Sequence, residues 1–340
     1  MLQLLYKSVF IFASSTIENA PGFIMGPIND FLGAILNIIF NLVHFLTEPN
    51  SLGITIIIFT LITRCLMIPS GIKSQRSMLT MRKLQPEIEK IKVKYGGSKD
   101  PETQRKMNAE MQVLYSANNY NPLSGCIPMF ITLPIFMALS YLLRQPYMYI
   151  GRIGTLYNEI ALLIQRLPDN KNVLETIIQP IVDNYTNKGK IDVDIRVISD
   201  MVRALNKFSS AEWNDIMSKL ADSPIKNELQ MVLNQKTGLE TFAGLNLLNR
   251  SGFALPGILI PILSSVTQFA SSFYSFKVNP PTDSSQKTTQ MMMLVGMPLF
   301  MGYVTASFSI GVGIYWITGN VFFFFQQLLI SRYLLRKQAK

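Results

Sequence analysis

The chain has 340 residues, of which 49% are hydrophobic and only 15% are charged, and its formal net charge is +10. Soluble domains carry about 25% charged residues, so this composition argues against an ordinary soluble protein. The two cysteines, Cys65 and Cys126, both fall within or beside apolar runs, which excludes a disulfide framework in the hydrophilic segments.

Residues 1–51 precede the first long apolar run. The opening stretch MLQLLYKSVFIFASS fits a weak signal sequence or an interfacial anchor, and both alternatives stay open. Further on, Asp30, Asn37, Asn41 and His44 recur near the helical period among large aliphatic residues. This pattern predicts an amphipathic helix in the membrane interface. His44 is the only histidine, and we expect it on the solvated stripe rather than in a catalytic role.

Five apolar runs are each close to the roughly 20 residues needed to cross about 30 Å of hydrocarbon. We therefore predict an all-α integral membrane protein with five transmembrane helices. The predicted spans are 52–72, 122–143, 255–276, 291–308 and 311–331.

The segment 73–121 is the most regularly patterned polar region. Apolar residues recur at spacings of three and four from Met81 to Tyr95 and again from Met107 to Asn118, with a Gly/Pro turn at 96–101. This pattern predicts an antiparallel helical hairpin, in which Pro86 kinks the first helix or marks a restart. Methionine side chains suit surfaces that accept varied partners, but ordinary seam packing explains them equally well. The expected contact residues are Met78, Met81, Arg82, Lys83, Met107 and Met111.

The segment 144–254 alternates amphipathic stretches with polar breaks, and it predicts a small helical insertion without chemical motifs. Within it, Ser209 and Glu212 fit a capping box at a helix N-terminus. A link at 277–290 and a basic tail at 332–340 complete the chain.

Basic residues are concentrated in three connecting segments. Residues 73–121 hold ten Lys or Arg against five Asp or Glu, and 277–290 and 332–340 are also net basic. The positive-inside rule places these three segments in the cytoplasm. With five spans, the N-terminus and the insertion 144–254 then lie outside, and the C-terminus lies inside.

Several enzyme classes are excluded by inventory. One histidine cannot supply a HExxH zinc site, no Asp or Glu falls within a predicted span, and no glycine-rich phosphate loop follows a strand. We therefore expect no catalytic residues, no metal and no cofactor.

Arg64 interrupts the first predicted span. An arginine at the centre of a spanning helix costs about 2.5–3.5 kcal/mol on insertion-based scales. Either its side chain snorkels to the cytoplasmic headgroups, or it lies in a water-filled cavity inside the bundle. Polar side chains elsewhere in the spans favour the cavity, although hydrogen bonds between helices also explain them. These residues are Thr60, Thr63, Thr132, Gln268, Thr318, Asn320, Gln326 and Gln327.

About 220 residues resemble the core of the YidC/Oxa/Alb family of membrane protein insertases. The motifs are TRCLMIPSGIKSQRSMLTMRKLQPEIEKIKVKYGG, EMQVLYSANNYNPLSGCIPMFITLPIFMAL, LPGILIPILSSVTQF and GVGIYWITGN, in the family's order. The chain looks like a bacterial YidC of the short form, without the large N-terminal periplasmic domain. Thr132 stands where many members carry glutamine, and 144–254 is far longer than in compact members.

The resemblance implies five spans around a hydrophilic groove open to cytoplasm and lipid. By the same matching, Arg64 lies in the groove and Gln268 and Trp316 lie in its wall. The implied function is an insertase and chaperone that inserts nascent membrane proteins into the bacterial plasma membrane, alone or with the Sec translocon. Nascent membrane proteins, the bilayer, the Sec translocon and the ribosome are the implied partners; the short basic tail offers the only expected contact with nucleic acid.

Two other functions use the same groove. A lipid scramblase would pass lipid headgroups through it, and a non-inserting assembly factor would fold clients that the Sec translocon has already inserted. The sequence leaves both alternatives open.

Overall fold

The computed structural model describes residues 25–96, 100–121, 127–166, 174–180, 183, 194, 196–220, 225–278 and 284–338. Cys126 and the N-terminal stretch before residue 25 lie outside these ranges. The chain forms two compact units, which are described separately. The first unit contains residues 1–59, 134–258 and 306–314, and the second contains 60–133, 259–305 and 315–340.

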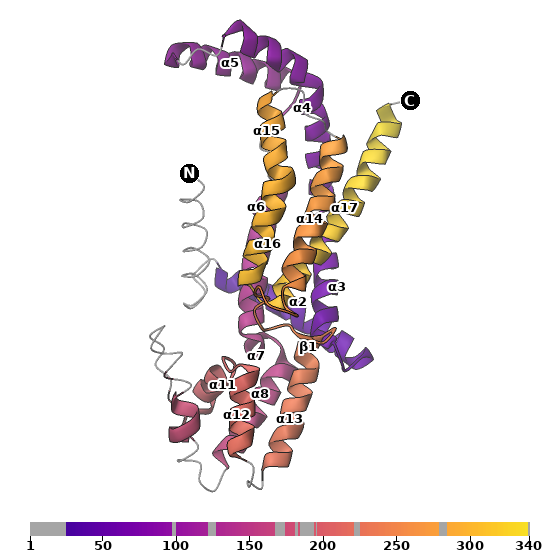
Figure 1. Ribbon diagram of the computed structural model, residues 1–340. Helices are drawn as coiled ribbons and strands as arrows, with labels where there is room; N and C mark the ends of the chain where they lie inside the picture. The colour runs from indigo at the N-terminus through magenta and orange to yellow at the C-terminus, as the bar shows by residue number, and fades with distance from the viewer. Residues whose placement is uncertain are drawn as a thin grey trace. The chain divides into compact units, whose positions relative to one another are not determined.

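The first unit is helical and is built around α8 (Gly151–Gln165), which contacts α7 (Pro146–Tyr149), α11 (Ile198–Leu205) and α13 (Lys226–Glu240) (Figure 1). One face of α8 is fully buried, because apolar residues recur along it at spacings of three and four. The other elements of this unit are α2 (Met25–Leu46), η2 (Leu174–Ile178), α12 (Ser210–Lys219), β1 (Thr241–Phe242) and β2 (Leu245–Asn246).

The two short strands form a tight antiparallel hairpin. Thr241 pairs with Asn246 and Phe242 with Leu245. Ala243 and Gly244 make the turn with φ of +51° and +79°. Two consecutive positive φ values match the twist of the flanking strands, and they favour glycine at the second position.

Helix α2 has a buried side and an exposed apolar side. Leu36 and Phe40 are fully buried, whereas Ile38, Leu42 and Phe45 are more than half exposed. His44 is half-buried and stacks on Phe40. The interfacial location of this helix stays a prediction, since α2 is also long and apolar enough to cross a membrane.

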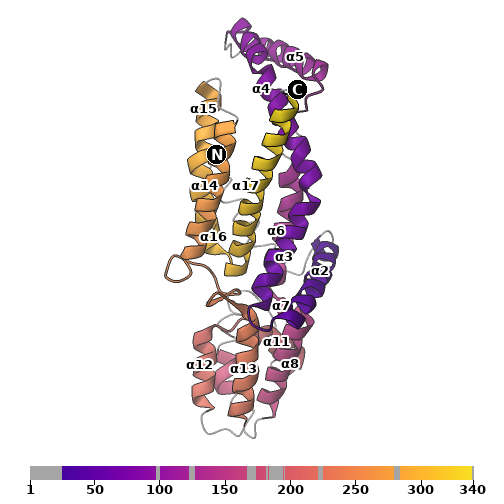
Figure 2. The same cartoon turned by 90° about the vertical axis from the view of Figure 1, so that its right-hand side faces the viewer.

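The second unit contains the remaining long helices. They are α4 (Ile68–Lys94), α5 (Pro101–Ala117), α14 (Leu259–Val278), α15 (Ser284–Met291), η3 (Met292–Gly296), α16 (Met297–Ser307) and most of α17 (Ile310–Gln338). Helices α3 (Ser51–Leu66) and α6 (Ile127–Arg144) each begin or end in the other unit. Helices α14, α16 and α17 run side by side in both ribbon views (Figures 1 and 2).

Hydroxyl and amide groups connect α14 to α16 and α17. Thr305 donates a hydrogen bond to the Ser264 hydroxyl at 3.1 Å, and Ser265 donates to the Pro298 carbonyl at 3.0 Å. Asn320 donates to the Ser264 carbonyl at 3.4 Å and to the Thr267 hydroxyl at 3.3 Å. Such bonds between helices are typical of membrane bundles, where lipid tails offer polar side chains no partner.

The first predicted span differs from the single helix expected over 52–72. Helix α3 ends at Leu66, Met67 forms the break, and α4 starts at Ile68 with a bend of 54°. Pro69 lies in the first turn of α4, where it lacks the N–H that would continue α3. Pro86, by contrast, lies inside α4, which runs through it without a restart.

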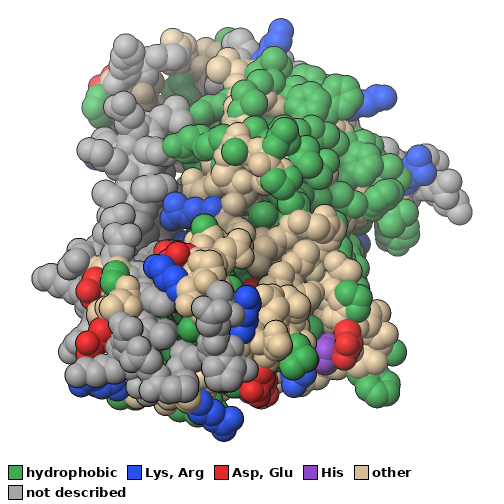
Figure 3. Space-filling view, turned by 60° about the horizontal axis from the view of Figure 1, so that its bottom comes forward, with side chains coloured by type: hydrophobic (Ala, Val, Ile, Leu, Met, Phe, Trp, Pro, Cys, Tyr) green, Lys and Arg blue, Asp and Glu red, His purple; other side chains and the backbone are tan. Residues whose placement is uncertain are grey.

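Two described helices, Met25–Leu46 and Ile310–Tyr333, are long and apolar enough to cross a membrane, and the bent α3–α4 pair makes up to three. Phe130–Arg144 and Met292–Ser307 are shorter apolar helices. Hydrophobic side chains gather in a broad area in Figure 3, while charged side chains are scattered around it. Large apolar side chains such as Leu299, Val266 and Phe273 are at least half exposed. An exposed apolar surface of this kind fits contact with lipid.

The helical hairpin consists of α4 and α5. Leu84, Ile88 and Ile91 are buried along α4, as the periodicity indicated, whereas no residue of α5 is buried. Glu110 of α5 accepts hydrogen bonds from Lys94 and Tyr95, both at 2.8 Å. These bonds hold the pKa of the Glu110 carboxyl below its usual value, with Lys94 the larger cause.

Candidate functional site: a polar pocket around Arg64

A pocket with a volume of about 450 Å³ lies within the second unit and contains the Arg64 side chain. Helices α3, α4, α14, α15 and α17 and the π-helix η3 supply its walls. The lining residues are Arg64, Met67, Gly71, Ser74, Gln75, Met78, Gln268, Ser271, Ser272, Ser275, Phe276, Gln290, Met293, Leu294, Phe323, Gln326 and Gln327. Ten of these carry an amide, a hydroxyl or a guanidinium, so the pocket is polar in a chain that is mostly apolar.

Arg64 is the only charged residue among the described residues that line the pocket. It lies in the last turn of α3 and is half-buried. Its Nε atom is fully buried and makes no hydrogen bond within the described part of the chain. A buried donor without an acceptor costs about 1–3 kcal/mol, and more when the group is charged. The guanidinium is therefore ready to bind an acceptor that enters the pocket.

The aromatic ring of Tyr315 provides part of the support for this cation. The Cζ atom of Arg64 lies 5.7 Å from the centroid of the Tyr315 ring. Such a contact contributes about 0.5–2 kcal/mol, depending on exposure. A ring face attracts a cation without neutralising it, so the positive charge stays available to a ligand.

Gly319 leaves the space that the guanidinium occupies. A Cβ atom at residue 319 would lie 2.6 Å from Nη2 of Arg64, 3.0 Å from Nε and 3.2 Å from Cζ. Real Cβ atoms essentially never approach another heavy atom within 3.0 Å. The absence of a side chain at residue 319 therefore permits the observed position of Arg64.

A second unsatisfied polar atom lies in the same lining. Gln327 is 5% exposed, and its Oε1 is buried without a hydrogen-bond partner among the described residues. Two residues of the lining thus each carry a buried polar atom without a hydrogen-bond partner among the described residues, a donor on Arg64 and an acceptor on Gln327. Polar groups of this kind bind water when a cavity is large enough to hold it.

The structure brings together only some of the residues predicted for the groove. Arg64 and Gln268 line the pocket, whereas Thr60, Thr63, Thr132, Trp316 and Asn320 are not among its lining residues. Thr63 donates to the Thr60 carbonyl within α3 at 2.9 Å, and the Thr132 hydroxyl lies 3.9 Å from the Met67 sulfur. Trp316 is 9% exposed. Asn320 donates hydrogen bonds to α14, and its place in a groove stays a prediction.

The residues predicted for hairpin contacts lie in different surroundings. Met78 lines the pocket, while Met81, Met107 and Met111 are half-buried along the hairpin. Lys83 is exposed, and Arg82 donates to the Val278 carbonyl at the end of α14, at 3.1 Å.

Sequence reasoning missed the serines of α14, although a signal was present. Gln268, Ser271, Ser272 and Ser275 occur at positions i, i+3, i+4 and i+7, which define one face of a helix. A polar stripe along an apolar helix indicates a wall facing water or polar groups. Within the described residues, no cluster of His, Cys, Asp or Glu could hold a metal ion.

Fold and site together define an all-α membrane protein in which the described residues place one cation, Arg64, in a polar pocket. A model of the 60Kd inner membrane protein family matches residues 42–338, so the chain belongs to this family. It is a multi-pass membrane protein of bacterial type.

Several similar proteins are named membrane protein insertases. The chain is 26% identical over 296 residues to "Membrane protein insertase YidC 1" of Bacillus anthracis, covering 85% of this chain and 76% of that protein. It is 27% identical over 310 residues to "Membrane protein insertase YidC" of Caldanaerobacter subterraneus subsp. tengcongensis, covering 91% and 96%. A shorter match, to "Membrane protein insertase YidC" of Enterococcus faecalis, is 45% identical over 97 residues, covering 28% of this chain and 35% of that protein.

Proposed function

We propose that this chain inserts nascent membrane proteins into the bacterial plasma membrane, and that the Arg64 pocket receives a polar client segment. One observation carries the proposal: Arg64 is a partly buried cation, and among the described residues its Nε has no hydrogen-bond partner and no acidic residue lines its pocket. The family relatives named as insertases support the same function.

The attraction between Arg64 and an acidic client segment has a useful magnitude. A carboxylate about 4 Å from the guanidinium gains about 4 kcal/mol at an effective dielectric constant of 20. This is large enough to draw a hydrophilic tail part-way into the membrane region. The membrane potential adds about 2.3 kcal/mol per charge per 100 mV when an acidic residue moves to the outer side. Burial of the client's apolar helix in lipid completes the driving force.

The proposal includes the topology expected from charge. Five spans at the predicted bounds would place the N-terminus and residues 144–254 outside, with the hairpin α4–α5 and the C-terminus in the cytoplasm. The pocket would then be the inner part of a hydrophilic groove, from which the client helix leaves between the first and last spans. No bond is made or broken in this mechanism. The Sec translocon and the ribosome are the proposed partners on the delivery side.

The test is insertion of a single-span client with an acidic N-terminal tail into liposomes that carry the purified protein. Protease protection of the tail measures insertion, and the proteins compared are wild type, Arg64→Ala and Arg64→Lys. We expect loss of insertion with alanine and substantial recovery with lysine, because lysine restores the charge but not the planar donor set. A client with a neutral tail is the matched control, and it should depend less on residue 64.

Other outcomes would support the competing functions. Transfer of fluorescent lipids without any client would indicate a scramblase. Normal membrane insertion but faulty folding of clients in depleted cells would indicate an assembly factor. Equal insertion by all three residue-64 variants would overturn the proposed role of Arg64.

A further inference from the structure

Arg82 lies where the helical hairpin meets a wall of the Arg64 pocket. Its Nη1 donates a hydrogen bond to the Val278 carbonyl at 3.1 Å. Val278 is the last residue of α14, so this carbonyl has no acceptor role within the helix and lies at the negative end of the helix dipole. A cationic side chain is well suited to cap such an end. The contact therefore joins α4 to the C-terminus of α14.

This contact lies beside one end of the pocket. Met78 is the last residue of α4 that lines the pocket, and Phe276 is the last residue of α14 that does so. Arg82 follows Met78 by one helical turn and so continues the face that α4 turns towards the pocket. Met78 is 36% exposed, which makes this end accessible. The end formed by Met78 and Phe276 is here called the pocket mouth.

The two cations of this region lie at different depths. Arg82 follows Arg64 by 18 residues, nearly all of them helical. At 1.5 Å per residue this is a path of about 27 Å, which the bend at Met67 shortens only in part. One carboxylate cannot contact both guanidinium groups across such a distance. An acidic residue on a client segment would therefore meet Arg82 and Arg64 one after the other.

The Arg82 guanidinium can bind a carboxylate while it holds Val278. An arginine has five N–H donors, and the contact with Val278 uses Nη1 alone. The side chain is exposed, and it takes part in no ion pair within the described part of the chain. Arginine binds carboxylates through two parallel hydrogen bonds, which a lysine cannot reproduce. The donors that Val278 leaves over are thus sufficient for a client acid.

We propose that Arg82 is a second client-binding cation, which captures a carboxylate of the client segment at the pocket mouth before that segment reaches Arg64. This inference rests on the proposed function and adds to it a residue that acts during entry. An exposed charge mainly accelerates association, whereas the half-buried Arg64 would hold the acid inside. The hydrogen bond to Val278 keeps the long Arg82 side chain beside the mouth, which lowers the entropy cost of capture.

The test is the initial rate at which the acidic-tail client inserts into liposomes that carry the full-length protein. Arg82→Gln should lower this rate about threefold to tenfold at low ionic strength, because it removes the charge that steers the client. The final extent of insertion should change little, since Arg64 is intact. The difference should shrink in high salt, because the Debye length falls from about 10 Å at 0.1 M to about 3 Å at 1 M. Arg82→Lys should recover part of the rate.

Two controls separate capture from a structural role of Arg82. Lys83→Gln is the matched variant, because Lys83 is the next residue of α4, is also exposed and has no hydrogen bond to α14 among the described residues. A client with a neutral tail should insert at the same rate with arginine or glutamine at residue 82. Thermal unfolding of each variant shows whether the substitution leaves the fold intact.

Disulfide crosslinking locates the client at the pocket mouth. The protein carries Met78→Cys together with Cys65→Ser and Cys126→Ser, and the client carries one cysteine beside its acidic residue. Copper phenanthroline oxidises the two thiols to a disulfide wherever they meet. Arg82→Gln should reduce crosslinking to residue 78, whereas Arg64→Ala should leave it in place.

Three results would overturn the inference. They are an insertion rate in Arg82→Gln equal to that in Lys83→Gln, equal slowing of the acidic-tail and neutral-tail clients, and crosslinking at residue 78 that does not depend on residue 82. Each can occur while the wild-type protein inserts the client and depends on Arg64, so the inference can fail alone. If the wild-type protein inserts no client, the proposed function is wrong and the role of Arg82 falls with it.

Discussion

Gly319 lies against Arg64, so the effect of Gly319→Ala on the free energy of unfolding should change sign with the residue at position 64. In Gly319→Ala, the new Cβ would lie 2.6 Å from Nη2 of Arg64, whereas ordinary contacts begin near 3.4 Å. The guanidinium must therefore retreat by about 0.8 Å, and the same movement changes its position relative to Tyr315. Overpacking typically costs about 1–3 kcal/mol, and the cost here should be near 1 kcal/mol because the atoms that must move belong to the end of a flexible side chain.

The same substitution should become favourable once the guanidinium is removed. In an Arg64→Ala background, no arginine atom meets the new Cβ, and glycine-to-alanine inside a helix gains about 0.5–1 kcal/mol. We therefore expect Gly319→Ala to lower the free energy of unfolding when arginine occupies residue 64 and to raise it when alanine does. The coupling energy of this double-mutant cycle should be about 1.5–2 kcal/mol, summing the two effects.

The assay is denaturant unfolding of the four proteins in detergent, combined with the liposome insertion assay. Gly296→Ala is the matched control, because a Cβ there meets only Met292 Cγ at an ordinary 3.6 Å. Insertion of the acidic-tail client should fall in Gly319→Ala and remain normal in Gly296→Ala. Equal destabilisation by Gly319→Ala in both backgrounds would refute the reasoning, since the cost would then arise from a neighbour other than Arg64.

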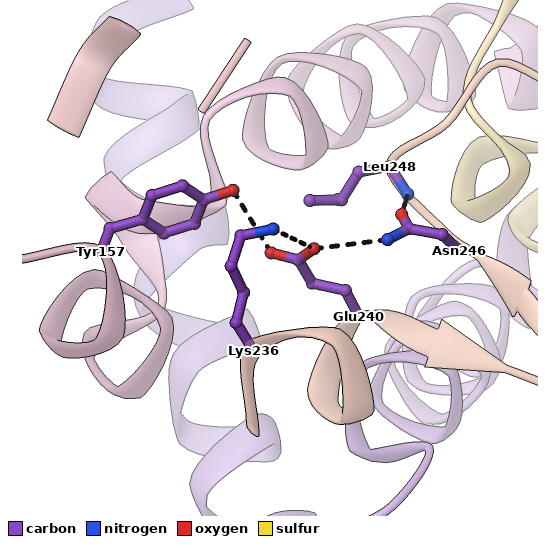
Figure 4. Close-up of polar contacts among 5 residues, drawn as sticks. All are labelled: Tyr157, Lys236, Glu240, Asn246 and Leu248. Atoms are coloured by element: carbon purple, nitrogen blue, oxygen red, sulfur yellow. Dashed lines mark hydrogen bonds and ion pairs between the residues drawn. The ribbon is translucent and has the colours of Figure 1, made fainter. Parts of the chain in front are cut away.

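Three further predictions concern parts of the chain away from the pocket. Glu240→Gln or Lys236→Met alone should lower the free energy of unfolding by about 3–5 kcal/mol, because each leaves a buried charge unpaired (Figure 4). The two substitutions together should lower it much less, and thermal unfolding of the three variants measures the difference. Ser209→Ala removes the capping-box hydrogen bond of α12 and should cost about 1 kcal/mol, and Ser210→Ala should cost less. The pKa of Glu110 is lowered, so its contribution to the hairpin is present above its unfolded pKa and lost as the pH falls through the folded value. The protection factors of the α5 amides, which correct for the intrinsic pH dependence of exchange, should therefore fall on acidification, and Glu110→Gln should remove that dependence.

Local sequence signals predicted elements well where the determining interactions are close in sequence. The Ser209–Glu212 capping box is confirmed at the start of α12, because a cap depends on residues three positions apart. The α4 periodicity likewise identified Leu84, Ile88 and Ile91 as buried. The break at Met67 was not predicted, although Pro69 marked it, since an apolar run conceals where a helix bends.

The buried ion pair of α13, in which Nζ of Lys236 lies 2.9 Å from Oε2 of Glu240, was missed for a different reason. Leu229, Leu233, Lys236 and Glu240 follow spacings of four, three and four, so the two charged residues lie on the apolar face of the helix. The charges of Lys236 and Glu240 alone favour positions in solvent, whereas their spacing places both residues on the buried face of the helix. A cavity beside this pair is lined by α12, α13 and residues 244–257. These segments are distant in sequence, and no local pattern could bring them together.

The same limit applies to the pocket. Arg64 was identified because a charge in an apolar run is visible in the sequence itself. Asn320 and Gln327 are both polar residues of α17, yet Asn320 bonds across to α14 and Gln327 lines the pocket. The difference depends on the rotation of α17 against its neighbours, which composition does not determine.

The chemistry of the pocket suggests why the described part of its lining contains no acidic residue. A permanent carboxylate beside Arg64 would satisfy the guanidinium and compete with every client. With amides, hydroxyls and an aromatic ring around it, the cation keeps an attraction of about 4 kcal/mol for one client carboxylate, from which the costs of desolvation and of ordering the segment are subtracted. An interaction of that strength can orient a tethered segment, and it breaks readily once the client helix enters lipid. A weak, unneutralised cation is therefore better suited to repeated transfer than a strong binding site.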